Sequence, residues 1–153
     1  MMLRSRLYPS ARMKPILIHM PTRCVLPARF PGPRYPLAES VLDDAIIQPY
    51  VHDCMVLVHE GSQVHRFRVF YKRHCHLPVN RSFAGRRILR GDIVVMRAGV
   101  LCPLSVVNMR GRDTAVSDWM IHRWVKIESP VFCYSFRIID LCTDWLLSAF
   151  HTC

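Results

Sequence analysis

The sequence is poor in glycine, and it lacks the glycine-rich loops that bind phosphate groups. Only six of its 153 residues are glycine. Neither the dinucleotide-binding pattern G-x-G-x-x-G nor the nucleotide-binding loop G-x-x-x-x-G-K-[ST] occurs. A serine on a glycine elbow is missing too, and Ser117, Asp118 and His122 are neighbours only because they share an expected helix. These absences argue against an enzyme, so we expect a non-enzymatic protein without a cofactor.

Closely spaced cysteines are absent as well. The seven cysteines are odd in number, lie far apart and include no C-x-x-C pair, which argues against a disulfide framework or a zinc knuckle. No secretory signal peptide is recognisable, so we expect reduced thiols that pack as small hydrophobic side chains. We therefore predict an intracellular protein of the cytoplasm or nucleus. The mitochondrion is the alternative because the start is basic, although Pro9 and Pro15 interrupt the amphipathic helix of a presequence.

Acidic side chains are missing from residues 1–36, which contain seven basic residues and seven of the eleven prolines. Prolines at this density prevent a continuous helix, so we predict a basic arm that is extended or disordered. The whole chain has a net charge of +10, which attracts phosphate in a salt-dependent way. Only three of the 21 basic residues are lysine, and a GC-rich coding sequence alone would produce such an arginine excess.

Residues 37–128 show the hydrophobic patterns of one folded domain. Two segments have apolar residues at helical spacing, and four are rich in β-forming residues. These elements are expected over 37–46 (helix), 51–59, 64–71, 88–96 and 104–109 (strands), and 113–127 (helix). The connection at 60–63 contains Gly61 and predicts a hairpin, and Asp113 is placed to cap the last helix.

These elements predict an α+β fold class. We expect a small four-stranded, mainly antiparallel sheet with a short N-terminal helix and a covering helix after the sheet. The main alternative is a small half-open barrel. In the second strand of the hairpin, Phe67, Val69 and Tyr71 alternate with Arg66, Arg68 and Phe70, so one face is expected to be buried and the other largely wet.

The last segment, residues 129–153, is apolar, but charged residues interrupt it. Arg137, Asp140 and Asp144 lie in its middle part. Each would cost about 2.5 to 3.5 kcal/mol near the centre of a bilayer, so we do not expect membrane insertion. The segment has no clean amphipathic pattern, and we place it outside the domain as an apolar tail.

His74 and His76 are the strongest candidates for a metal site. Residues two apart share a face of an extended chain, so both imidazoles can reach one ion. His52 and Cys54 repeat this spacing on an earlier strand. Four nitrogen and sulfur ligands would suit zinc. The eight histidines of the chain make such spacings common, and surface or packing roles are the alternative.

Arginines around the strands are the candidate contacts for another macromolecule. We nominate Arg66, Arg68, Arg97 and Arg110. The leading hypothesis is a packed interface with an unidentified macromolecular partner. The alternative is a basic, largely non-specific domain for RNA or DNA, in which Phe67, Tyr71 or Phe83 would stack on bases, unless Phe67 and Tyr71 point at the core. The two hypotheses differ in the salt dependence of binding.

Two short motifs are interpreted as turns. Arg90-Gly91-Asp92 has the integrin-binding pattern, and residues 80–82 fit the N-glycosylation pattern. Both functions require secretion, for which the sequence shows no signal. Glycine, asparagine and aspartate are ordinary turn residues at such positions.

Four segments together carry a resemblance to other proteins: 66–73 (RFRVFYKR), 77–82 (LPVNRS), 91–97 (GDIVVMR) and 107–113 (VNMRGRD). Over residues 65–124 the chain resembles uncharacterised small proteins of mushroom-forming (basidiomycete) fungi. The resemblance implies no known activity, cofactor or catalytic residue. It also suggests the hypothesis that residues 129–153 are a translated intron and residues 1–36 an upstream extension, neither belonging to the true gene product.

Overall fold

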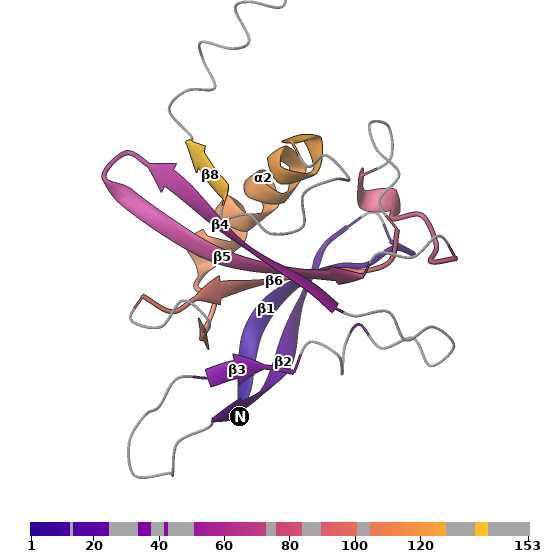
Figure 1. The fold of residues 1–153 in the computed structure, drawn as a ribbon, viewed down its shortest axis with the longest axis horizontal. Helices are drawn as coiled ribbons and strands as arrows, with labels where there is room; N and C mark the ends of the chain where they lie inside the picture. The colour runs from indigo at the N-terminus through magenta and orange to yellow at the C-terminus, as the bar shows by residue number, and fades with distance from the viewer. Residues whose placement is uncertain are drawn as a thin grey trace, which may run out of the picture.

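The computed structural model describes residues 1–12, 14–24, 34–37, 42, 51–72, 76–83, 90–100, 105–127 and 137–140. Within these residues the chain forms one sheet of eight strands and one long helix that packs against it (Figure 1). The elements are β1 (Met2–Tyr8), β2 (Ile16–Cys24), β3 (Arg34–Pro36), β4 (Val51–Glu60), β5 (Gln63–Lys72), a 3₁₀ turn (Arg81–Phe83), β6 (Ile93–Ala98), β7 (Val106–Val107), α2 (Gly111–Ile127) and β8 (Arg137–Asp140).

Six strands pair antiparallel in the order β3-β2-β1-β6-β5-β4, and β8 joins the free edge of β4 in parallel. β6 is central, with β5 on one side and β1 on the other along residues 93–95. Beyond the end of the β1 pairing, β7 pairs with Arg97 and Ala98 on the same side of β6. The β1–β2 pair runs across the direction of the β4–β5 hairpin, so the sheet is curled (Figure 1).

The predicted four-stranded sheet with two helices is wrong. The described residues contain eight strands, and two of the longest, β1 and β2, come from the segment expected to be an arm. Pro9 and Pro15 lie in the connection between these strands, where they break no ladder. Pro21 lies within β2, but the amide of Thr22 bonds to Met1, so the alternation of the strand directs the Pro21 nitrogen away from β1. The half-open barrel, kept as the alternative, describes this curled sheet.

The β4–β5 hairpin is confirmed. Its ladder runs from the Val51–Lys72 pair to the Glu60–Gln63 pair, so the turn consists of two residues. Gly61, the first of them, has a φ of 58°, which a two-residue hairpin turn requires and glycine adopts without strain.

The remaining predicted elements differ in their bounds. α2 begins two residues earlier than expected, at Gly111. The strand predicted over 88–96 begins at Ile93, and the strand predicted over 104–109 is only two residues long. The predicted helix over 37–46 lies outside the described residues except for Leu37 and Leu42, of which Leu42 is helical and buried.

The sheet buries apolar side chains on both faces. One core lies between the sheet and α2, where Phe67, Val69 and Val95 pack with Met120 and Ile121. Fully burying an aliphatic or aromatic side chain contributes about 1.5 to 3 kcal/mol, so this contact holds α2 in place. The core on the opposite face is formed by Leu3, Met20, Leu42, Phe70, Val94, Met96 and Val106.

The second core corrects the prediction that one face of β5 is largely wet. Arg68, Phe70 and Lys72 lie on that face and are all buried. Long basic side chains can cover apolar neighbours with their aliphatic stems, which explains why a charged pattern does not mean an exposed face.

Part of the predicted tail belongs to the sheet. Residues 137–140 form β8 and pair with residues 56–59 of β4. The other residues of 129–153 lie outside the described part of the chain. Within the described part, no helix has both the length and the apolar character needed to cross a membrane.

Candidate functional site

The predicted metal ligands are not assembled into a site in the described residues. His52 and Cys54 share the α2-facing side of β4, as their spacing predicts, but the His52 ring stacks on Tyr71 with centroids 5.5 Å apart and Cys54 is buried. His76 is exposed on the loop after β5, and His74 lies outside the described residues. No group of three His, Cys, Asp or Glu side chains in the described part of the chain could hold a metal ion.

Two of the four nominated arginines make ion pairs within the fold. Arg68 is 9% exposed, pairs with Asp53 and places its guanidinium 5.1 Å from the centroid of the Phe70 ring. Arg97 pairs with Asp113 across 2.9 Å. These guanidinium groups neutralise carboxylates of their own chain, so their first role is to stabilise the sheet and its contact with α2.

The other two nominated arginines lie nearer the surface. Arg66 donates a 3.4 Å hydrogen bond to the carbonyl of Val100 and is half-buried. The side chain of Arg110 is exposed at the start of α2. The four arginines therefore do not form one binding surface, because β5 directs Arg66 and Arg68 to the face opposite α2 while Arg97 lies on the α2 side.

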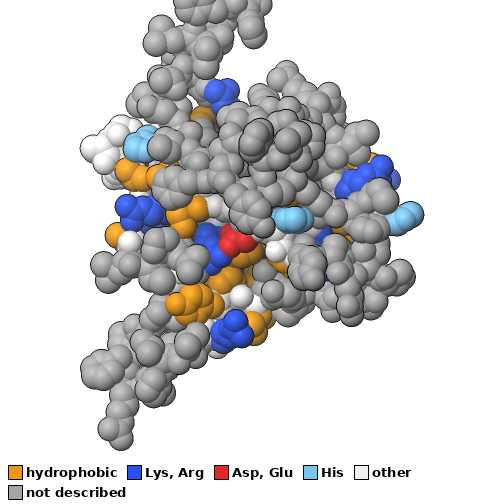
Figure 2. All heavy atoms as spheres, viewed as in Figure 1, with side chains coloured by type: hydrophobic (Ala, Val, Ile, Leu, Met, Phe, Trp, Pro, Cys, Tyr) orange, Lys and Arg blue, Asp and Glu red, His pale blue; other side chains and the backbone are white. Residues whose placement is uncertain are grey.

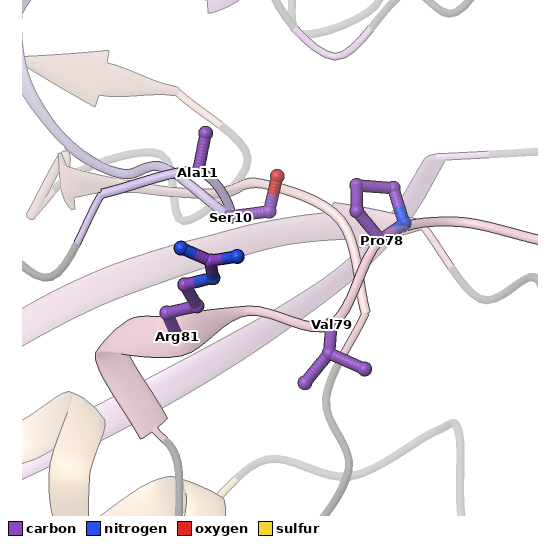
Figure 3. A pocket seen from close by; sticks show the side chains of 5 residues that line it. All are labelled: Ser10, Ala11, Pro78, Val79 and Arg81. Carbon is purple, nitrogen blue, oxygen red and sulfur yellow. The ribbon is translucent and has the colours of Figure 1, made fainter.

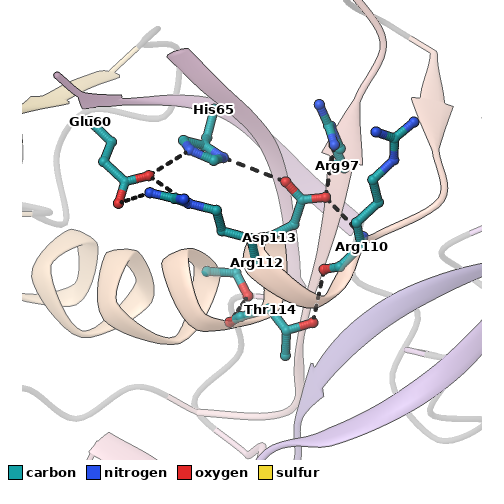
Figure 4. Close-up of polar contacts among 8 residues, drawn as sticks. Glu60, His65, Arg97, Arg110, Arg112, Asp113 and Thr114 are labelled. Atoms are coloured by element: carbon teal, nitrogen blue, oxygen red, sulfur yellow. Dashed lines mark hydrogen bonds and ion pairs between the residues drawn. The ribbon is translucent and has the colours of Figure 1, made fainter. Parts of the chain in front are cut away.

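A network of charged side chains surrounds His65 (Figure 4). The ring Nε2 lies 3.0 Å from Glu60 Oε2, and Nδ1 lies 3.4 Å from Asp113 Oδ1. Both ring nitrogens thus face carboxylate oxygens at the end of the hairpin. Arg112 binds Glu60 at 2.9 Å and 3.1 Å, and its hydrogen bond, followed by that of His65, holds the pKa of Glu60 below its usual value.

Asp113 is the residue in which this network meets the helix. Its Oδ2 accepts hydrogen bonds from the Arg97 guanidinium at 2.9 Å and from the backbone N–H of Arg110 at 2.8 Å. The second bond satisfies an amide at the helix start, as the third residue of a capping box does. The sequence predicted a cap at Asp113, but His65 and Arg97 reach it only through strand pairing. The network joins the hairpin, β6 and α2, and its charged groups form hydrogen bonds and ion pairs with one another.

A second polar contact attaches α2 to β1. Asp118 accepts two hydrogen bonds from Arg6, at 2.9 Å and 2.7 Å, and one from the Tyr8 hydroxyl at 2.6 Å. Burial, and then the hydrogen bond to Asp118, raise the pKa of Tyr8 well above its usual value. One turn further along α2, the ring of His122 meets Phe83 edge-on, with centroids 5.3 Å apart.

The two turn motifs have structural roles. Asn80 is 1% exposed, and its amide donates to the carbonyls of Tyr8 and Gly91 at 2.9 Å and 2.8 Å. A glycan would replace one of the two hydrogens on this nitrogen, so at least one of these hydrogen bonds would be lost. In the second motif, Gly91 has a φ of 73°, and the Asp92 carboxylate accepts the Ser10 amide at 2.6 Å, so both motifs hold the loops beside β1.

Five acidic side chains are engaged in contacts within the fold. Each accepts a hydrogen bond or forms an ion pair: Asp53, Glu60, Asp92, Asp113 and Asp118. Several cations, in contrast, are exposed and have no carboxylate partner among the described residues: Arg4, Arg12, Lys14, Arg23, Arg81 and Arg110. The described surface therefore presents an excess of positive charge.

Three of the basic residues share one surface, which we call the ribbon face: the α2 side of β1 and β2 with Arg4, His19 and Arg23. The register places Arg4 opposite His19, and Arg23 opposite Tyr35 of β3. All three basic side chains are exposed, as are Met2 and Leu17 on the same face. Figure 2 shows basic and hydrophobic side chains side by side on the visible face of the molecule, with the visible acidic atoms near its centre.

The loop before α2 borders the ribbon face. Asn108 accepts the backbone N–H of Arg4 at 2.9 Å, and the amide of Met109 donates to the carbonyl of Arg4 at 3.3 Å. Sequence reasoning missed this surface because it treated residues 1–36 as an arm. The available signal was the alternation in residues 3–8, where apolar or small residues occupy one face and Arg4, Arg6 and Tyr8 the other.

Comparison with known proteins gives no assignment. No family model matches the sequence, and neither a curated protein nor a solved structure proved similar to it. The function is therefore argued from the side chains and their surroundings.

Proposed function

We propose that the protein is a non-enzymatic module that binds single-stranded nucleic acid through the ribbon face. The observation that supports this proposal is the distribution of charge. Five acidic side chains are engaged within the fold, while Arg4, His19 and Arg23 are exposed on one sheet surface and have no carboxylate partner in the part of the chain that the structure describes. Such a surface attracts the phosphates of a nucleic acid, and counterions are released when they bind.

The arrangement favours a single strand over a duplex. His19 and Arg23 are four residues apart on β2, or about 13 Å along the strand, so these two polar side chains follow the direction of an extended chain. Tyr35 lies opposite Arg23, where an aromatic ring can stack on a base. Met2 and Leu17 add exposed apolar surface, which contacts unstacked bases but has little to contact on the outside of a duplex.

The more general hypothesis from the sequence, a packed interface with a protein partner, is the competing proposal. Such an interface buries an apolar centre and responds weakly to salt, whereas phosphate contacts weaken steeply as salt rises. An intracellular location remains part of the proposal.

The test measures binding of the full chain to a fluorescent oligouridylate at several salt concentrations. We compare the double variant Arg4→Gln/Arg23→Gln with the control Arg12→Gln/Lys14→Gln, which removes two exposed charges from the connection between β1 and β2. Both variants have the same net charge, +10 − 2 = +8. We expect the ribbon variant alone to reduce the slope of log affinity against log salt, by about 1.4 for two contacts.

Three results would overturn the proposal. An equal reduction of this slope in both variants would mean that the total charge, and not the ribbon face, governs binding. Affinity that does not change with salt, or no binding at low salt, would favour the protein partner instead.

A further inference from the structure

A pocket with a volume of about 340 Å³ lies beside the end of β1, away from the ribbon face. Ser10 and Ala11 line it from the turn after β1, and Pro78, Val79 and Arg81 line it from the loop that follows β5. Figure 3 shows the Arg81 guanidinium extended toward Ser10, with Pro78 across from it. The volume is at the lower end of the range of small-molecule sites.

The two walls of the pocket are held together by hydrogen bonds. The Arg81 amide donates to the carbonyl of Ser10 at 3.2 Å, and the Ser82 hydroxyl donates to the carbonyl of Arg12 at 2.9 Å. Asn80, between the lining residues Val79 and Arg81, binds the carbonyl of Tyr8. The pocket is thus largely formed before a ligand arrives, which lowers the entropy lost on binding.

The charge in the pocket comes from Arg81. Within the described residues, no carboxylate lies within ion-pair distance of its guanidinium, which is exposed at the pocket. The carboxylate of Asp92 contacts the pocket wall, where one of its oxygens accepts a hydrogen bond from the Ser10 amide at 2.6 Å. The other lining side chains are a hydroxyl and three apolar groups, Ala11, Pro78 and Val79.

We propose that this pocket binds a small monoanion that has one carboxylate and an aliphatic body. The Arg81 guanidinium can bind a carboxylate through two parallel hydrogen bonds. The apolar side chains of Ala11, Pro78 and Val79 then contact the aliphatic part of the ligand. Such a ligand is either a free short-chain acid or the C-terminal residue of a peptide.

A phosphate group fits this pocket less well. A single guanidinium balances one negative charge, and a second charge would be placed against apolar walls and near Asp92. The site is also independent of nucleic-acid binding, because Arg4 lies in the first half of β1 and Ser10 lies in the turn after this strand. Failure of one proposal therefore does not decide the other.

The test uses N-acetyl-leucine and its uncharged amide as a matched pair of probes. Each is titrated into the full chain while the methyl signals of Ala11 and Val79 are followed by NMR. We expect the acid to shift both methyl signals in a saturable way and the amide to leave them unchanged. Arg81→Gln should lower the affinity for the acid by about tenfold or more. The control is Arg12→Gln, a change to an exposed arginine that does not line the pocket, and it should leave the affinity within about twofold of the unaltered chain.

A second pair of probes identifies the source of the carboxylate. Tighter binding of isovalerate than of N-acetyl-leucine supports a free short acid, and the reverse supports a peptide terminus. Equal binding of the acid and the amide, equal binding by Arg81→Gln and the unaltered chain, or no shift of either methyl signal with millimolar acid would each overturn the proposal.

Discussion

The hydroxyl of Tyr8 donates a 2.6 Å hydrogen bond to Asp118, a residue 110 positions later in the chain. This contact joins the first strand to the long helix, and Arg6 strengthens it by binding both carboxylate oxygens of Asp118. Because Tyr8 is 1% exposed, water cannot easily take the place of either partner if this hydrogen bond is broken. The contact explains why the N-terminal strand belongs to the same folding unit as α2.

Replacement of Tyr8 by phenylalanine should destabilise the fold. The variant keeps the ring in the core but removes a hydrogen bond to a charged acceptor, for which we expect a loss of about 1.5 to 3 kcal/mol. Urea unfolding measures the change. A double-mutant cycle with Asp118→Asn isolates the pair, and a coupling energy near zero would contradict the role given to this bond.

The same residue should make stability depend on alkaline pH. Burial and Asp118 raise the pKa of Tyr8 above its usual value of 10.0. Below that value the phenol is neutral in both the folded and the unfolded chain, so its contribution is fully present. At higher pH the unfolded chain ionises first, and the free energy of unfolding falls by about 1.4 kcal/mol per pH unit. Unfolding of the unaltered chain and of Tyr8→Phe from about pH 9 to 11 checks this, and parallel pH profiles would disprove it.

Asn80→Ala should lower the free energy of unfolding by about 2 to 4 kcal/mol, because it leaves the buried carbonyls of Tyr8 and Gly91 without their hydrogen-bond donor. Asn108→Ala is the matched control. Asn108 is exposed and accepts a single bond from the backbone of Arg4, so we expect a loss below about 1 kcal/mol. Thermal unfolding of both variants measures the difference, and similar losses would refute the central role of Asn80.

Gly91→Ala should be destabilising, whereas Gly111→Ala should not. Gly91 has a φ of 73°, and an added Cβ would lie 3.0 Å from Leu77 Cδ1. The positive φ alone costs an alanine about 1 to 2 kcal/mol. Gly111 has no such φ and no atom within 4 Å of the added Cβ, so alanine there should stabilise the first turn of α2 by up to about 1 kcal/mol. Equal effects at the two positions in urea unfolding would contradict this account.

Ser5→Ala should leave stability unchanged or raise it by up to about 1 kcal/mol. The Ser5 side chain is fully buried, and its hydroxyl has no hydrogen-bond partner in the described structure. Removing an unsatisfied buried hydroxyl recovers its desolvation cost. A loss of more than about 1 kcal/mol on unfolding would show that the hydroxyl has a partner in solution.

Local patterns were enough to predict the hairpin and the long helix. Alternation and the glycine at 61 placed β4 and β5 within about one residue, and apolar spacing placed α2 within two residues. In both elements the contacts that decide the structure lie close together in the chain. The short strand β7 was also expected, but its length depends on where β6 and the ribbon stop pairing.

The candidate sites depended on pairings that no local pattern shows. The ribbon face exists because β1 pairs with β6, more than 80 residues later, and the alternation in residues 2–8 is too short to predict that partner. Arg97 and Arg68 were predicted to be contacts for a partner, yet each has a carboxylate of its own chain beside it. Which charges remain on the surface depends on which carboxylates the fold brings near.

The sequence by itself determined the positive net charge, the hairpin and the amphipathic helix, since these depend on composition and on neighbours within a few residues. Only the tertiary structure decided that the proline-rich start adds two strands to the sheet, that Arg6 and Tyr8 meet Asp118, and that Arg81 faces a pocket with Ser10. The physical reason is that these contacts form between segments separated by 70 residues or more, and the energy that selects them comes from the shared cores of the curled sheet.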